Sequence, residues 1–208
     1  MINVGLLGAG RIGKVHAKSI TAHPGSKLVA IADVNHAAAE HLAKEAGAQA
    51  RAVGDIIEDR RIDAVLIATS TDTHSDLIEA ATAAGKAVLC EKPVDLSLAR
   101  AQACQAAAAR YGRPVMIGFN RRFDPNFAAV KKALDAGEIG KGELLSITSF
   151  DPSPPRPSAT SRCRAGCSVT WPSMTSAGSS VARRWKSLPW AAASSTRLSA
   201  LLATWTPP

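Results

Sequence analysis

The sequence has no Asp, Glu or His after residue 151, although all 17 acidic residues and all five His lie before that point. Residues 152–208 also hold all four Trp, eight of the twelve Pro and seven of the 25 Lys and Arg. The first 151 residues are therefore nearly neutral, and the formal net charge of +8 comes mainly from this tail. Because the tail lacks hydrophobic periodicity and helix-capping signals, its charge does not indicate a nucleic-acid or membrane partner.

Long apolar runs are absent too, and no stretch approaches the length of about 20 residues that crosses a bilayer. Met1 leads into an expected strand instead of a signal sequence, so we expect a cytoplasmic protein. Cysteine is scarce: Cys90 and Cys104 fall in an expected strand and helix, while Cys163 and Cys167 lie in the tail with no His nearby. This pattern favours reduced, buried thiols over a disulfide framework or a metal site.

What the first 151 residues do contain is an alternation of short apolar runs and longer Ala-rich amphipathic stretches. The pattern predicts strands at 3–7, 27–32, 63–68, 86–90 and 114–118, with helices up to about 23 and at 36–46, 73–84 and 96–111. Repeated strand–helix units predict an α/β fold, a doubly wound parallel sheet or Rossmann domain over residues 1–120. Ligands of such sheets bind along the carboxyl edge of the strands, so functional residues are expected there.

Residues 8–13, which follow the first expected strand, read Gly-Ala-Gly-Arg-Ile-Gly. This spacing is the dinucleotide-binding pattern, in which the glycines allow a tight turn, close approach to a pyrophosphate and close packing of helix on strand. The helix that follows offers free N–H groups to the anion. The predicted cofactor-binding residues of this loop are Gly8, Gly10, Arg11, Ile12 and Gly13. The alternative interpretation is a glycine-rich turn with no ligand.

Asp33 ends the second expected strand, twenty residues beyond Gly13. A carboxylate at this distance accepts hydrogen bonds from the adenosine ribose and repels a 2′-phosphate, so it predicts NAD over NADP. The alternative is that Asp33 is solvated and caps the helix that begins near His36.

Glu91, Lys92 and Pro93 follow the strand at 86–90, at the same edge of the expected sheet. A lysine in this position can hydrogen-bond a substrate hydroxyl and take part in proton transfer, and Glu91 can orient it. The alternative is a surface lysine followed by a proline turn.

Four segments carry a family resemblance: GAGRIG at 8–13, ATSTDTH at 68–74, GKAVLCEKP at 85–93 and GFNRRFD at 118–124. In this order they resemble the glucose-fructose oxidoreductase, inositol dehydrogenase and MocA family, and within it the bacterial inositol 2-dehydrogenases. The resemblance spans about residues 2–155. It implies an NAD-dependent dehydrogenase that oxidises a secondary hydroxyl of a cyclic polyol, with myo-inositol as the first expectation.

The resemblance also implies roles for individual residues. Lys92 is expected to be the catalytic lysine and to bind substrate. Asn120 and Arg121 are expected to approach the nicotinamide or substrate, and the cofactor pocket is expected to be lined by Thr69, Ser70, Thr71, His74 and Glu91. Three alternatives remain open: a dehydrogenase for another sugar or inositol isomer, an NAD-binding pseudo-enzyme, and a nucleic-acid-associated protein that uses the basic tail.

Family members continue into a second domain with an open antiparallel sheet, which covers the active site and mediates homo-oligomerisation. Residues 121–155 begin such a domain, with a helix predicted at 126–136 and a strand at 143–150. The inositol enzymes then carry an Asp and a His four residues apart, of which the His is thought to act as acid/base. The tail at 156–208 contains neither residue type.

Our hypothesis for this departure is a one-base frameshift near Pro155. Back-translation of the tail with free choice of synonymous codons, read from the third base of each codon, yields a string that contains RDMAIHDF. The Asp and His thus reappear at the expected spacing. The alternative is a genuine Ser/Pro/Arg-rich disordered extension. With an out-of-frame and disordered tail, we expect this chain to be weakly active or inactive, and monomeric or prone to aggregate.

Overall fold

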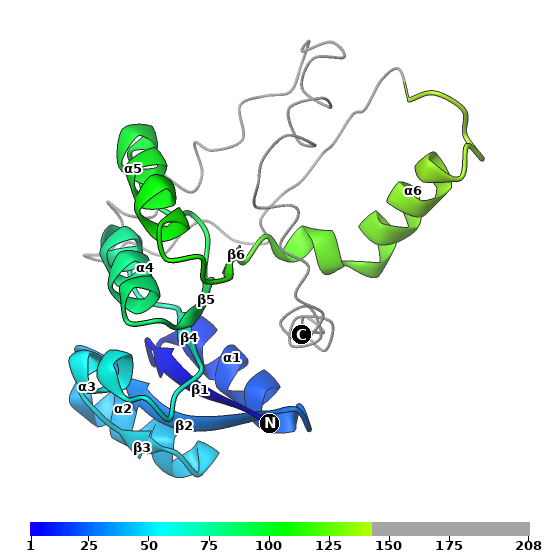
Figure 1. Ribbon diagram of the computed structural model, residues 1–208. Helices are drawn as coiled ribbons and strands as arrows, with labels where there is room; N and C mark the ends of the chain where they lie inside the picture. The colour runs from blue at the N-terminus through cyan, green and yellow to red at the C-terminus, as the bar shows by residue number, and fades with distance from the viewer. Residues whose placement is uncertain (143–208) are drawn as a thin grey trace, which may run out of the picture. The chain divides into compact units, whose positions relative to one another are not determined.

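The computed structural model describes residues 1–142, which form alternating strands and helices (Figure 1). The elements are β1 Ile2–Leu7, α1 Arg11–Ala22, β2 Ser26–Ala32, α2 His36–Ala46, β3 Gln49–Ala50, α3 Val53–Glu58, β4 Ala64–Ile67, η1 Thr71–Thr73, α4 His74–Ala83, β5 Ala87–Cys90, α5 Leu98–Ala109, β6 Val115–Ile117, η2 Asn120–Phe123 and α6 Pro125–Asp135. The described residues belong to two units, and the chain passes from the first to the second between Phe119 and Asn120. The predicted strand at 143–150 and the tail at 156–208, for which we predict a frameshift, lie outside the described residues.

The six strands form one sheet in the order β3-β2-β1-β4-β5-β6, and all their pairings are parallel. The chain moves from β1 outward to β3 and then returns to the other side of β1, which makes the gap between β1 and β4 the point where strand order reverses. The doubly wound parallel sheet predicted from the sequence is therefore confirmed. Such a reversal opens a crevice at the carboxyl edge of the sheet, where ligands bind.

The register aligns the strand ends with one another. Leu7 pairs with Ala32 and Ile67, and Cys90 pairs with Ile67 and Ile117. The segments that leave the sheet after these residues therefore start side by side. They begin with Gly8, Asp33, Ala68, Glu91 and Gly118.

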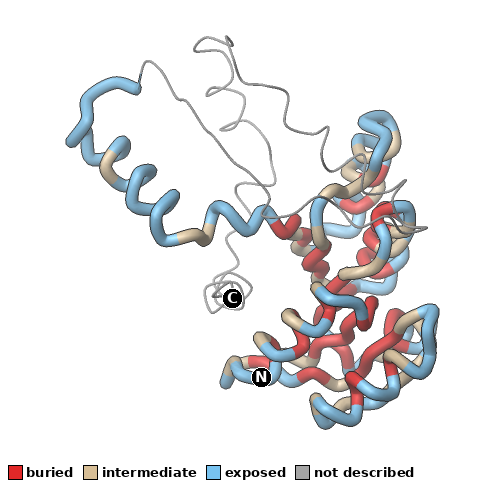
Figure 2. The backbone as a smooth tube through the Cα atoms, turned by 180° about the vertical axis from the view of Figure 1, so that it is seen from behind, coloured by how far each residue is buried: buried red, intermediate tan, exposed pale blue. Residues whose placement is uncertain are grey.

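The core lies on both faces of the sheet, as Figure 2 shows by the buried colour along the strands. All four residues of β4 are buried, and Leu6, Ile31 and Ile67 are fully enclosed. Helix α1 buries positions 13, 16, 17 and 20, the spacing of one helical face. Burial on both faces explains why the strands read as continuous apolar runs instead of alternating patterns.

One strand and one α-helix were missed from the sequence, β3 and α3, as were the short 3-10 helices η1 and η2. Strand β3 has only two residues, and α3 has six, so neither supplies enough positions to establish a periodicity. Helix α3 is held by packing: a Cβ built on Gly5 of β1 would lie 2.3 Å from a methyl carbon of Ile56, which is fully buried. The glycine thus lets this short helix approach the sheet.

The second unit begins with η2 and α6. Asp124 accepts hydrogen bonds from the backbone N–H groups of Asn126 and Phe127, and Pro125 occupies the first turn, a typical start of a helix. No residue of α6 is buried. Over residues 1–142, no helix has the length and apolar character needed to cross a membrane.

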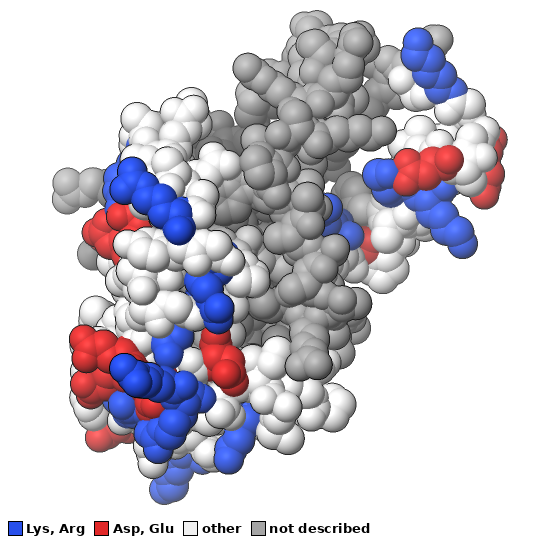
Figure 3. Space-filling view, in the orientation of Figure 1, with Lys and Arg blue, Asp and Glu red and all other residues white. Residues whose placement is uncertain are grey.

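Charged side chains of both signs are interspersed on the face drawn in Figure 3. The described residues on this face form no broad patch of one sign. This arrangement agrees with the nearly neutral composition of the first 151 residues.

Candidate active site

The glycine loop between β1 and α1 is built by two backbone contacts that exclude side chains. Gly8 has a φ of +106°, and a Cβ on it would lie 2.4 Å from the carbonyl oxygen of Ala68. A Cβ on Gly13 would lie 1.9 Å from the carbonyl oxygen of Gly8. Contacts this short leave no room for a methyl group, so these two glycines hold β1, β4 and α1 close together.

Gly10 differs from these two glycines. A Cβ built on it would meet nothing within 4 Å, so the space beside it is open. Gly10 is also the N-cap of the 12-residue helix α1, and no side chain caps this helix end. Its first N–H groups, including those of Arg11 and Ile12, have no intrahelical partner and are available to an anion. The loop therefore fits the pyrophosphate of a dinucleotide.

Asp33 is tied to the same loop. Its Oδ2 accepts a hydrogen bond of 2.7 Å from the N–H of Ala9, and its Oδ1 accepts one of 2.8 Å from the N–H of Asn35. The side chain that caps α2 is Asn35, which accepts from the N–H of Ala38, so the alternative role of Asp33 as the cap is wrong. A carboxylate offers about four lone-pair sites, so Asp33 retains acceptor capacity for a ribose hydroxyl.

The segment after β4 forms the next part of this edge. Thr69 Oγ1 lies 2.7 Å from Thr73 Oγ1, and Thr73 Oγ1 donates to the carbonyl of Ser70. Ser70 is exposed, and Thr71 is buried. These bonds form a compact turn at the end of β4. The role of Thr69, Ser70 and Thr71 in the cofactor pocket stays a prediction.

Glu91 is held between two elements at the end of β5. Its Oε1 lies 2.8 Å from Nε2 of His16, a buried residue of α1, and its N–H donates to the carbonyl of Ile67. A Cβ on Gly118 would lie 3.2 Å from the same carboxylate, so the glycine makes room for it. Sequence analysis missed His16. Its position four residues before Ile20 could have placed it on the buried face of the expected helix, because residues four apart share one helical face.

Lys92 is exposed, and its amine has no hydrogen-bond partner within residues 1–142. The residue that follows, Pro93, is joined to it by a cis peptide bond. Strand β5 is the neighbour of β4, which in turn pairs with β1, so Lys92 leaves the sheet at the same edge as the glycine loop. This arrangement brings a free amine to the edge where a dinucleotide is expected.

His74 is the first residue of α4 and is only 1% exposed. Its Nδ1 lies 2.7 Å from the carbonyl oxygen of Pro93, and its Nε2 lies 3.2 Å from that of Thr69. Both ring nitrogens thus face backbone groups of the two segments that flank the site. Direct contact of His74 with the cofactor stays a prediction.

Asn120 and Arg121 lie in η2 of the second unit. Within that unit the Arg121 guanidinium lies over the ring of Phe127, 5.5 Å from its centroid. This distance permits a cation–π interaction. The predicted approach of Asn120 and Arg121 to nicotinamide or substrate stays a prediction.

Cys90 and Cys104 are buried and free. Burial raises the pKa of the Cys90 thiol well above its usual range and raises that of Cys104 to about 11. Both therefore remain protonated at neutral pH, which makes them poor nucleophiles. The prediction that these thiols are buried is confirmed for both residues. No group of three or more His, Cys, Asp or Glu side chains in residues 1–142 could hold a metal ion.

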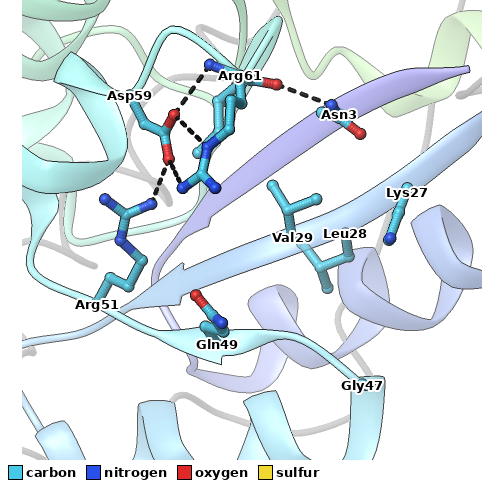
Figure 4. A pocket seen from close by; sticks show the side chains of 10 residues that line it. Asn3, Lys27, Leu28, Val29, Gly47, Gln49, Arg51, Asp59 and Arg61 are labelled. Carbon is cyan, nitrogen blue, oxygen red and sulfur yellow. Dashed lines mark hydrogen bonds and ion pairs between the residues drawn. The ribbon is translucent and has the colours of Figure 1, made fainter.

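A pocket of about 320 Å³ lies at the opposite, amino edge of the sheet (Figure 4). Asp59 lies there between Arg51 and Arg61, at 2.5 and 2.7 Å from their guanidinium nitrogens. Arg61 and Arg51 hold the pKa of this carboxyl well below its usual range. The network is completed by Asn3, whose side-chain amide donates to the carbonyl of Arg61. This pocket is thus separate from the edge that carries Gly8 and Lys92.

Lys86 anchors the loop that contributes Asp59. Its Nζ donates to the carbonyls of Asp59 and Ile62 at 2.6 and 2.8 Å, and the residue is only 4% exposed. Burial lowers its pKa. Sequence analysis assigned no role to this lysine, because a single Lys at the start of a strand carries no pattern.

Comparison with known proteins gives three similarities. A family model described as an oxidoreductase family with an NAD-binding Rossmann fold matches residues 2–119. The inositol 2-dehydrogenase of Rhizobium meliloti is 52% identical over 154 residues, which cover 74% of this chain and 47% of that protein. The crystal structure of a myo-inositol dehydrogenase from Corynebacterium glutamicum is 43% identical, with a TM-score of 0.65, and the match covers 68% of this chain and 43% of that one.

A further solved structure is that of scyllo-inositol dehydrogenase from Lactobacillus casei, which holds NAD(H) and scyllo-inositol. It is 34% identical to this chain, with a TM-score of 0.64, and the match covers 67% of this chain and 42% of that one. The chain thus spans about half the length of the curated relatives it matches.

Proposed function

This chain belongs to the GFO/IDH/MocA oxidoreductase family, whose model matches its residues 2–119, and from that membership we propose that it serves NAD-dependent oxidation of a cyclic polyol. The observation that carries the proposal is the shared strand edge, where the open Gly10 loop, Asp33 and the exposed Lys92 follow the carboxyl ends of parallel strands β1, β2 and β5 of one sheet. The relatives named for inositol oxidation make myo-inositol the first substrate to test.

In this proposal each part of the edge has a separate task. The N–H groups that begin α1 bind the pyrophosphate, and Asp33 accepts hydrogen bonds from the ribose and disfavours a 2′-phosphate. When bound, NAD⁺ supplies the acceptor for the hydride that leaves the carbinol carbon. The amine of Lys92 hydrogen-bonds the substrate hydroxyl and assists removal of its proton. Glu91, fixed by His16, holds the chain just before Lys92 in place.

We expect NAD⁺ to bind to the 208-residue chain, with little or no turnover. The reason is the tail: no Asp or His follows residue 151 to fill the acid/base pair that the resemblance requires. The test is calorimetric titration of the full chain with NAD⁺ and with NADP⁺. It is followed by an assay of NADH formation with myo-inositol, scyllo-inositol and glucose as separate substrates.

Lys92→Met and Lys18→Met form the matched pair for this assay. Both remove an amine from an exposed lysine, but Lys18 lies on the solvent face of α1. Any polyol-dependent NADH formation should be lost in Lys92→Met and retained in Lys18→Met, while both variants bind NAD⁺ normally. A wild-type chain that does not bind NAD⁺ at millimolar concentration refutes the proposal.

A second candidate is an NAD-binding module without chemistry, which the composition of the tail favours. The coding DNA across codons 150–160 and past codon 208 separates the two. A missing or extra base with an open frame through RDMAIHDF supports a misread polyol dehydrogenase, whose corrected product should oxidise inositol. Confirmed DNA with that frame closed supports the binding module.

A further inference from the structure

The carbonyl group of Pro93, the residue after Lys92, is held by the buried ring of His74. The distance from Nδ1 of His74 to this oxygen is 2.7 Å, the shorter of the two contacts that the ring makes. Carbonyl oxygens only accept hydrogen bonds, so a ring nitrogen that bonds one must donate. The shorter contact therefore assigns a hydrogen to Nδ1, which donates to Pro93. Nε2 faces the carbonyl of Thr69 at the longer distance of 3.2 Å.

The next residue of α4 continues the same attachment. Ser75 is 1% exposed, and its Oγ lies 2.7 Å from Oδ2 of Asp95 and 3.1 Å from the carbonyl oxygen of Val94. The first turn of α4 thus holds three successive residues that follow Lys92, at positions 93 to 95. On the other side of Lys92, Glu91 is bonded to His16.

Lys92 is therefore a free side chain on an anchored backbone. Its own amine has no hydrogen-bond partner within residues 1–142, so nothing in that part of the chain fixes it directly. Its direction is set by the backbone on either side, and on the carboxyl side His74 and Ser75 of α4 bond residues 93–95. A small displacement of a reacting group is costly in catalysis: about 1 Å can reduce the rate by roughly a hundredfold.

We propose that His74 is a positioning residue for Lys92, acting through its Nδ1–H bond to the Pro93 carbonyl. The inference rests on the proposed function, because it takes Lys92 as the amine that meets the nicotinamide and substrate. It assigns His74 a role in orienting the lysine. The contact to Thr69 is secondary.

Two substitutions distinguish between the hydrogen-bond contacts of the two ring nitrogens of His74. The side-chain amide nitrogen of Asn occupies the place of Nδ1, so His74→Asn keeps a donor for Pro93. The amide nitrogen of Gln occupies the place of Nε2, so His74→Gln keeps a donor for Thr69 and loses the bond to Pro93. His41→Asn and His41→Gln are the controls, because that ring is 70% exposed on α2 and pairs with Glu45 on the same helix.

The measurement is the rate at which the Lys92 amine of the full chain is acetylated, followed by mass spectrometry with and without saturating NAD⁺. In the wild type, in His74→Asn and in both His41 variants, NAD⁺ should slow acetylation of Lys92. In His74→Gln, the rates with and without NAD⁺ should become equal, at an NAD⁺ concentration that calorimetry shows to saturate this variant. This loss of protection with intact binding is a result that a merely structural role would not produce.

The other outcomes refute either the positioning role of His74 or the place of Lys92 beside the nicotinamide. Equal protection in His74→Gln and the wild type refutes the positioning role and leaves the proposed function standing. A wild-type chain that binds NAD⁺ without protecting Lys92 refutes the place of Lys92 beside the nicotinamide, and this inference with it. If His74→Gln does not fold, His74→Leu replaces it, because leucine has no donor for the Pro93 carbonyl. Protection should then be lost, and unchanged protection contradicts the proposal.

Discussion

Replacing Gly10 and Gly13 with alanine, one at a time, should separate cofactor binding from folding. The two glycines lie three residues apart in the same loop and receive the same extra methyl group. At Gly13 this group would lie 1.9 Å from the carbonyl oxygen of Gly8, a backbone atom that cannot rotate away. Overpacking typically costs about 1–3 kcal/mol, and a clash with backbone belongs at the upper end. We therefore expect Gly13→Ala to lower the free energy of unfolding by about 3 kcal/mol.

At Gly10 the methyl group meets no protein atom within 4 Å. The residue is an N-cap with a φ of −70°, which alanine adopts readily, so the change in stability should stay below about 1 kcal/mol. The methyl group instead occupies the space expected for the pyrophosphate. Loss of one hydrogen bond to a charged group costs about 1.5–3 kcal/mol, which weakens NAD⁺ binding by roughly tenfold to a hundredfold.

Denaturant unfolding and calorimetric titration of the two variants provide the assay. We expect the two variants to differ in which property they lose. Gly13→Ala should have a lower free energy of unfolding, and Gly10→Ala should have a lower affinity for NAD⁺. If Gly10→Ala binds NAD⁺ as tightly as the wild type, the open space beside Gly10 is not where the pyrophosphate binds. If Gly10→Ala is destabilised as much as Gly13→Ala, the loop geometry is wrong.

Three further predictions concern single side chains. Asp33→Ser should weaken NAD⁺ binding and raise the NADP⁺ to NAD⁺ affinity ratio, since it removes the charge that repels a 2′-phosphate; an unchanged ratio in calorimetry contradicts the ribose role. Burial lowers the pKa of Lys86 below its usual 10.5. Just below pH 10.5 the unfolded state therefore binds more protons than the folded state, and the free energy of unfolding of the wild type should rise with pH in this range. In Lys86→Met this rise should shrink, and equal slopes in urea melts of the two proteins would refute it. Asp59 has its pKa lowered by Arg61 and Arg51, so its contribution to stability is present above pH 3.8 and is lost as the pH falls below that value; Asp59→Asn should flatten the acid side of the unfolding profile, and an unchanged acid profile would contradict the network.

The fold could be predicted over residues 1–119 because its signals are local and repeated. Apolar runs such as that of β4 are buried on both faces, and the amphipathic helices bury one face each. The glycine spacing at 8–13 predicted both the turn and a dinucleotide as its ligand, since each of the three glycines meets a different steric requirement of such a loop. By contrast, β3 and α3 are too short to leave a pattern, and the approach of Ile56 to Gly5 is a contact across 51 residues.

The candidate site was predicted in part. Strand ends and motif order identified Asp33, Glu91 and Lys92, because parallel strands bring their carboxyl ends to one edge. The hydrogen-bond partners at the site could not be predicted from the sequence. They are His16 for Glu91, Ala9 for Asp33, and the Pro93 carbonyl for His74. Each of these pairs joins segments that only the sheet brings together.

The sequence by itself thus determined the order of the elements and the dinucleotide loop, because these depend on periodicity and glycine spacing along the chain. It also marked the change of composition after residue 151, since this is a matter of residue counts alone. The tertiary structure decided which of three glycines leaves space for a ligand, which side chain caps α2, and which buried histidines hold the backbone beside Lys92. The histidine contacts join residues far apart in the chain, and they exist only once the parallel strands have aligned. The cap of α2 and the space beside each glycine depend on the backbone angles that the folded chain adopts.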